Sequence, residues 1–232
     1  MKKINLIFIL FLCLFFNEQL KSQSYLGIKG GVNVPTVNFN DFTNVPITTR
    51  FGTAYFVSPT FGISYRYMQN DKIGIQADLN YSTKGWGQGI GDSTNTFVAN
   101  RAFTEINYLE LPFYLHWQIF GSEKFKFFLD AGVYVAWALS STSTIQNEIG
   151  IEQVQIFYSV ENDNRGDFGL YAASGFSYDF SLFILQLEGS FKTGFANILP
   201  VNHFVRENPT ISTNQVPSFQ VSLLFPISKS RK

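Results

Sequence analysis

The sequence predicts an all-β protein, specifically an eight-stranded antiparallel up-and-down transmembrane β-barrel. Three observations lead to this prediction. Apolar and polar residues alternate with a period of two along eight segments, which is the pattern of strands with two unlike faces. The links between these segments alternate strictly between short and long, and short turns at one end with long loops at the other are typical of outer-membrane barrels. An export segment precedes the first strand.

The composition excludes several other classes of protein. The chain has 232 residues, of which 26 are Phe, 11 Tyr and 3 Trp, while only 15% are charged. Sparse charge with many aromatic rings argues against a disordered chain and against a nucleic-acid-binding protein. The mean hydropathy of +0.04 argues against a bundle of membrane helices, since each helix would need about 20 apolar residues in a row.

The amino terminus is predicted to be a cleaved signal peptide over residues 1–23, followed by one barrel domain over residues 24–232. Lys2 and Lys3 precede an apolar run over residues 4–16, which is short for a membrane span and suits an export signal. Cys13 is the only cysteine and lies inside this segment. The exported domain is therefore expected to contain no disulfide.

The eight predicted strands are justified by alternation, and 51–67 is the longest of them. Its odd positions are mostly apolar or aromatic and its even positions are mostly small or polar. The strands are expected at residues 25–34, 51–67, 73–82, 108–119, 125–139, 168–180, 183–195 and 219–227. Short links fall at 69–72, 121–124 and 179–181, and long links fall at 35–50, 87–104, 142–166 and 196–215.

Two prolines conflict with this assignment. Pro59 and Pro112 lie within predicted strands, and a proline cannot donate a hydrogen bond to a neighbouring strand. We therefore expect a β-bulge at each of them.

The apolar face is predicted to point outward into lipid. A soluble ligand-binding barrel would place it inside instead, but an eight-stranded barrel is just wide enough for side chains to fill. So many bulky Phe, Leu, Ile and Trp side chains would overfill it. Aromatic residues also gather near both ends of the strands, as expected for rings at the two membrane interfaces; examples are Tyr65, Trp117 and Tyr178 at the turn end and Tyr55, Trp137 and Phe195 at the loop end.

Charged side chains on the polar face are predicted to form a network inside the barrel, because unpaired charge in a low-dielectric interior is costly. In-register pairing would place His116 roughly opposite Asp130. It would also make Glu188 and Lys192 face Gly169, Tyr171, Ala173 and Gly175, whose small members leave room for long side chains. The alternative interpretation of the polar face is a narrow, partly hydrated pore. The expected network consists of Arg66, Asp78, Lys84, Glu110, His116, Lys126, Asp130, Asp179, Glu188 and Lys192.

No catalytic, metal or cofactor site is expected. The chain has two histidines, His116 and His203, and no serine lies in a nucleophile-elbow sequence. The segment 163–167 looks like a fragment of a calcium loop but lacks the remaining acidic ligands, so we expect a solvated turn there. Trp86, in a glycine-rich segment, is expected to be an exposed aromatic residue in a loop.

Five segments in order resemble the PorT-like family of outer-membrane β-barrels. The resemblance spans nearly the whole exported chain and implies an outer-membrane barrel; for the namesake of the family it implies a part in assembling a type IX protein-secretion system. The chain departs at its end, where Pro226 and a basic tail follow Phe225. The five segments are residues 27–33, 107–112, 130–135, 165–170 and 219–225.

The sequence thus predicts an integral protein of the bacterial outer membrane with a structural or interaction role and no catalytic activity. The alternatives are an accessory component of a type IX secretion assembly and a narrow small-solute channel. The expected partners are outer-membrane lipid and another envelope protein bound through loops or turns, with no nucleic acid.

Overall fold

The computed structural model describes residues 22–40, 56–90, 100–147, 150–153, 158–201 and 209–227. The predicted signal peptide lies almost wholly outside these residues and stays a prediction. His203 and the beginning of the predicted strand 51–67 also lie outside them.

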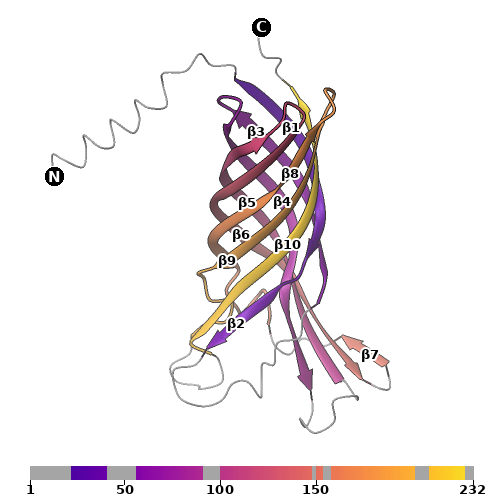
Figure 1. Ribbon diagram of the computed structural model, residues 1–232. Helices are drawn as coiled ribbons and strands as arrows, with labels where there is room; N and C mark the ends of the chain where they lie inside the picture. Colours follow the sequence, from indigo (N-terminus) through magenta and orange to yellow (C-terminus); the bar gives the residue numbers. More distant parts are fainter. Residues whose placement is uncertain are drawn as a thin grey trace, which may run out of the picture.

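The described chain folds into one antiparallel sheet of ten strands and matches the predicted all-β, up-and-down class (Figure 1). The strands are β1 (Gln23–Asn33), β2 (Thr36–Asn40), β3 (Ser58–Met68), β4 (Ile73–Ile90), β5 (Asn100–Gly121), β6 (Phe125–Asn147), β7 (Gly150–Gln153), β8 (Gly166–Asp179), β9 (Ile184–Gly194) and β10 (Ile211–Pro226).

The pairing of the strands is barrel-like. Neighbours follow the order β1, β3, β4, β5, β6, β8, β9, β10, and β1 pairs with β10 as well as with β3. β2 continues β1 in the same register along β10, after an interruption at Val34 and Pro35. The Val34 amide still donates to the Pro217 carbonyl at 2.8 Å, so β1 and β2 behave as one long strand. β7 pairs only with the end of β6 among the described strands.

The predicted short links are confirmed. β3–β4, β5–β6 and β8–β9 are joined by residues 69–72, 122–124 and 180–183, and these turns lie at the same end as the amino terminus of β1 and the carboxyl terminus of β10 (Figure 1). We call this the turn end and the opposite one the loop end.

The predicted long links are partly wrong, because strands continue into them. β4 extends to Ile90, β5 begins at Asn100, β6 extends to Asn147, β10 begins at Ile211, and 36–40 forms β2. The alternation of apolar and polar residues ends where the apolar belt ends, although backbone pairing goes on. In the predicted strand 51–67, the described residues 56 and 57 precede β3 and are not part of it.

The bulges predicted at the two prolines are also wrong. Pairing between β3 and β4 begins at Thr60, one residue after Pro59. Pairing between β4 and β5 omits the positions opposite Leu111 and Pro112 and then resumes in unchanged register. The register shifts lie instead in the β5–β6 pairing, between Asn107 and Tyr108 and between Gln118 and Phe120.

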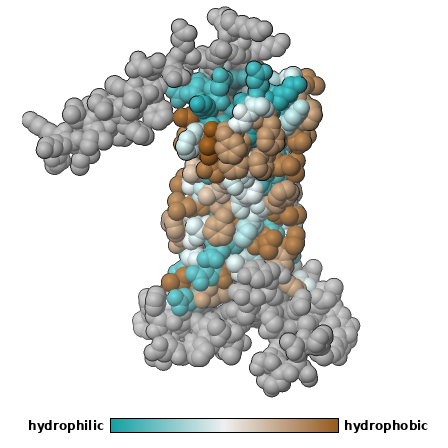
Figure 2. All heavy atoms as spheres, in the orientation of Figure 1, coloured by the Kyte–Doolittle hydropathy of each residue, from teal (hydrophilic) through white to brown (hydrophobic). Residues whose placement is uncertain are grey.

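The two faces of the sheet differ as predicted. Along β8, exposed and buried residues alternate almost without interruption. Over the whole sheet, the large exposed apolar residues are mainly Phe, Leu, Ile, Val and Trp. Figure 2 shows these apolar side chains over the middle of the visible wall, with a hydrophilic rim at the turn end. Exposed large apolar side chains lie on each of the long strands β1, β3, β4, β5, β6, β8, β9 and β10, which is far more than the isolated patches that soluble monomers expose; it is a surface for lipid. Among the described residues, no helix is long and apolar enough to cross a membrane.

Candidate functional site

The candidate site is the polar interior of the barrel-like sheet, and Lys29 is at its centre. Its ammonium lies 3.0 Å from Asp78 Oδ2 of β4 and 3.0 Å from Glu188 Oε1 of β9. Tyr114 donates to Asp78 at 2.9 Å, and the hydroxyl of Tyr171 bonds Glu188. The two tyrosine rings stack with centroids 4.6 Å apart. The Lys29 ion pairs and the stacking of the two tyrosine rings connect strands that are not neighbours in the sheet, so the interior is bridged across its width.

A second ion-pair group lies further toward the loop end. Glu110 of β5 contacts Lys84 of β4 and Lys192 of β9, each at 2.7 Å. Lys84 also lies 3.1 Å from Asp167 of β8. Asp167 accepts further hydrogen bonds from the Tyr134 hydroxyl at 3.0 Å and from the Asn214 amide at 2.9 Å, while the Lys84 ammonium lies 4.4 Å from the centroid of the Tyr134 ring.

Arg66 connects to the carboxylates indirectly, through two glutamines. Its Nε donates to Gln76 at 2.6 Å, and Gln76 donates to Asp78 at 2.7 Å. Its Nη2 donates to Gln186 at 2.5 Å, and Gln186 donates to Glu188 at 3.0 Å. The guanidinium is thus fixed symmetrically between β4 and β9 by neutral amides.

His116 and Asp130 form the pair that the sequence predicts. They are register partners on β5 and β6, and His116 Nδ1 lies 2.6 Å from Asp130 Oδ1. The predicted small partner is confirmed for Glu188, which lies opposite Gly175, whereas Lys192 lies opposite Tyr171.

The charges of the two ion-pair groups and Arg66 balance, and Asp130, beside His116, is a further buried carboxylate. Ions removed from water cost free energy unless partners and hydrogen bonds compensate, and these side chains are almost completely buried. The directly paired or amide-linked network holds four cations (Lys29, Arg66, Lys84 and Lys192) and four carboxylates (Asp78, Glu110, Asp167 and Glu188). This arrangement fills and stiffens the interior.

An apolar cluster covers the network at the loop end. Trp86 is only 1% exposed and lies in this cluster, where its ring and that of Phe39 form an edge-to-face contact with centroids 5.3 Å apart. The prediction of an exposed loop tryptophan is therefore wrong. Burial raises the pKa of Tyr158, in the turn before β8, to about 12, and Asp163 adds to this shift. The cluster consists of Val37, Trp86, Ile106, Tyr108, Tyr134, Ala136, Ala138, Tyr158, Ile198 and Leu199.

The structure brings together eight of the ten predicted network residues and leaves two at the rim. Lys126 and Asp179 are half-buried near the turn end, because their strands end there. Sequence reasoning missed Lys29 and Asp167. Both follow from the same alternation: Lys29 follows the exposed Ile28, and Asp167 precedes the exposed Phe168. The predicted solvated turn over 163–167 is therefore wrong at its last residue.

Within the part of the chain that the structure describes, no group of three or more His, Cys, Asp or Glu side chains could hold a metal ion.

An apolar outer wall around a charge-paired interior defines the class of transmembrane β-barrels. Residues 17–199 match the model of the family described as outer membrane protein beta-barrel domain. The chain belongs to this family, and lipid of the outer membrane is its environment.

The chain is similar to several solved structures at low sequence identity. The chain is 11% identical to the attachment invasion locus protein Ail of Yersinia pestis, covering 88% of this chain and 99% of that one with a TM-score of 0.41. It is 12% identical to OprG of Pseudomonas aeruginosa, with 88% and 94% covered and a TM-score of 0.42. It is 14% identical to outer membrane protein W of E. coli, with 87% and 98% covered and a TM-score of 0.41. A comparison with curated proteins found no match.

Proposed function

We propose that this protein is a closed eight-stranded outer-membrane barrel with a sealed interior, acting as a non-catalytic scaffold that presents its loop end to a binding partner. The observation that carries the proposal is the filled interior. Ion pairs bridge the barrel between β1, β4, β5, β8 and β9, and the apolar cluster lies beyond them.

The interior ion pairs and the apolar cluster beyond them argue against the small-solute channel. A conducting pore needs a continuous hydrated path, whereas the paired side chains here are buried and the cluster beside them is apolar. An ion crossing this interior would have to break several buried ion pairs, and each broken pair leaves a charge without compensation.

The scaffold role is supported by the length of the central strands. A transmembrane strand needs about 9–11 residues, but β5 has 22 residues and β6 has 23. The outward apolar residues end at Leu109 on β5 and at Leu139 on β6, so residues 100–108 and 140–147 continue past the membrane at the loop end, where β4, β5, β6 and β7 form a projecting sheet (Figure 1). Strands that extend past the membrane offer backbone edges to which a protein partner can add a strand.

Recording in a planar lipid bilayer tests the sealed interior. We expect the purified protein to give no stepwise conductance, with heat-dependent gel migration confirming that the inserted protein is folded. Stable, repeated single-channel steps from the folded protein would contradict the proposal and favour the channel.

A second candidate is an accessory role in a type IX secretion assembly, which the five PorT-like segments and the projecting sheet support. Co-purification after mild detergent extraction tests it: recovery of secretion components with the intact protein, but not with a variant lacking the β6–β7 hairpin, is the expected result. Recovery with both proteins would contradict docking through this sheet.

The absence of catalysis is likewise part of the proposal. It is supported by the placement of His116 inside the sealed interior, where it contacts Asp130. Acyl-transfer or deacylase turnover that is lost in His116→Ala would overturn it.

A further inference from the structure

The turn end of the barrel contains a cavity that the proposed scaffold role does not use. It measures about 170 Å³ and is lined by residues of both rim and interior, among them Arg66, Gln118, Lys126 and Ser177. At about 30 Å³ of liquid volume per water, this space could hold roughly five waters or one small polar ion. A wider hollow of about 610 Å³ beside the β5–β6 turn shares Asp71, Gln118 and Lys126 with it, so the cavity opens toward the turn end.

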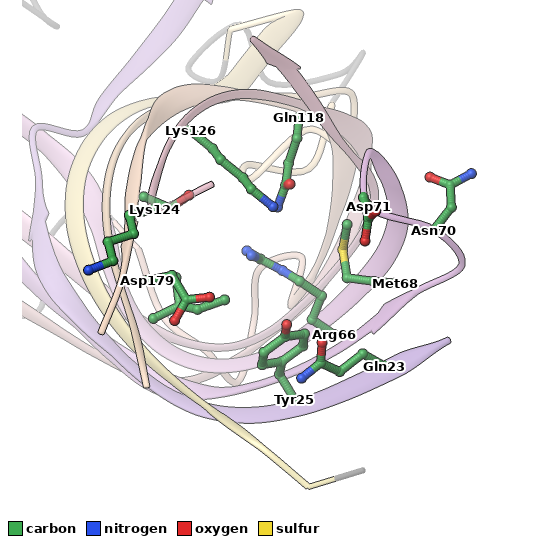
Figure 3. Close-up of a pocket in the computed structure, with 12 residues that line it drawn as sticks. Gln23, Tyr25, Arg66, Met68, Asn70, Asp71, Gln118, Lys124, Lys126 and Asp179 are labelled. Atoms are coloured by element: carbon green, nitrogen blue, oxygen red, sulfur yellow. The ribbon is translucent and has the colours of Figure 1, made fainter. Parts of the chain in front are cut away.

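Arg66 forms the floor of this cavity. It is 1% exposed, and while its Nε and Nη2 donate to Gln76 and Gln186, its Nη1 has no hydrogen-bond partner. A buried donor of a charged group without a partner is costly. Figure 3 shows the guanidinium pointing into the middle of the ring, toward the end of the Lys126 side chain.

The second cation of the cavity is also without a direct counter-ion. Lys126 forms no ion pair with a described carboxylate within 4.0 Å, in contrast to Lys29, Lys84 and Lys192 further inside. Figure 3 shows Gln118 reaching the same central region as Lys126, whereas Lys124 points away from it. Gln118 can turn its amide to donate, since its Oε1 has no hydrogen-bond partner.

The acidic groups of the rim do not neutralise these two cations. Asp179 accepts the Ser181 amide at 2.6 Å within the β8–β9 turn, and Asp71 is exposed in the β3–β4 turn. Both line the cavity, so they limit the net positive charge around it, but neither forms an ion pair with Arg66 or Lys126 within 4.0 Å. The centre of the cavity is therefore lined by hydrogen-bond donors and by two cations that have no direct ion pair with a described carboxylate.

We propose that this cavity binds a small free oxyanion of the size of phosphate. Arg66 Nη1 and the Lys126 ammonium would hold its charge, and Gln118 and Ser177 would donate further hydrogen bonds. Charge-assisted hydrogen bonds of this kind are the strong ones. A free ion is favoured over a lipid headgroup because the binding groups point inward, away from the lipid-facing wall.

Calorimetric titration with inorganic phosphate tests the site, using the full barrel in a maltoside detergent that contains no phosphate. We expect saturable binding and a shift of the Arg66 side-chain NMR signal. Loss of one charge-assisted hydrogen bond should weaken binding about tenfold or more in Lys126→Gln. The matched control Lys124→Gln should stay within about twofold, because Lys124 lines the edge of the cavity and its ammonium points away from the centre.

Lys126 is half-buried at the rim and outside the interior ion pairs, so this variant is expected to fold. The proposal is overturned by an absence of phosphate binding, by equal effects of the two lysine substitutions, or by an Arg66 signal that moves with added phosphatidylglycerol and not with free phosphate. The last result would assign the cavity to a lipid headgroup.

Discussion

At the scale of single residues, Glu110 shows how the interior is held together. One carboxylate contacts both Lys84 and Lys192 at 2.7 Å, and all three side chains are buried. A buried ion pair adds little to the free energy of unfolding compared with well-packed apolar residues in the same place. Removing one of its partners, however, leaves a buried charge without compensation and destabilises the fold. Glu110 has two such partners, so its loss affects more of the network than the loss of either lysine.

The Glu110→Gln variant should therefore be strongly destabilised. We expect the free energy of unfolding, measured by urea titration in detergent, to fall by about 3–5 kcal/mol. Glu123→Gln, the same chemical change at an exposed position in the β5–β6 turn, should change it by no more than about 0.5 kcal/mol. Similar effects of the two substitutions would show that the interior ion pairs do not stabilise the fold.

The alternation of apolar and polar residues along each strand predicts which side chains point into the barrel, and to that extent the candidate network could be predicted from the sequence. The His116–Asp130 contact was predictable because both residues lie on the polar faces of two strands joined by a short turn; the one-residue register shift between Gln118 and Phe120 was not predictable. Contacts such as Lys29 with Glu188 were not, since they join strands that are distant in the sequence and not neighbours in the sheet. Which inward charges meet depends on the curvature and stagger of the whole sheet.

At the scale of strands, the extension of β4 and β5 past the apolar belt is the main departure from the sequence prediction. The belt ends where lipid ends, so the two-residue pattern disappears while the strands still pair from Lys84–Ile106 to Ile90–Asn100. Gly85 lies at the start of this extension with a φ of 140°. An added Cβ would lie 1.8 Å from the Thr104 carbonyl oxygen, so the close approach of β4 to β5 requires glycine here.

The Gly85→Ala variant should disrupt the extension and leave the membrane-spanning part paired. We expect faster amide hydrogen exchange at residues 86–90 and 100–104, because the strained conformation costs about 1–3 kcal/mol. Gly189→Ala is the matched control, since a Cβ there would be 4.0 Å from its nearest neighbour, the Ser174 carbonyl oxygen. Unchanged exchange in Gly85→Ala would contradict the assigned strain.

At the scale of the whole molecule, the interior surrounded by the apolar wall has three layers that follow one another along the barrel axis. The cavity with Arg66 and Lys126 lies at the turn end, the charge-balanced network follows, and the apolar cluster with Trp86 lies at the loop end. The apolar wall faces lipid, and the ion-pair network and the apolar cluster fill the interior. Interaction with other molecules is left to the two ends, which is why the proposed scaffold and oxyanion sites lie there.

The membrane-spanning arrangement is tested most directly by labelling single cysteines in intact cells. Cys13 lies in the predicted signal peptide, so Glu161→Cys and Glu123→Cys each introduce one thiol into the barrel, exposed at the loop end and at the turn end. A large, membrane-impermeant maleimide should label Glu161→Cys in intact cells and should label Glu123→Cys only after the outer membrane is opened. Labelling of Glu123→Cys in intact cells, with or without Glu161→Cys, would contradict a barrel that spans the membrane with its loop end outside.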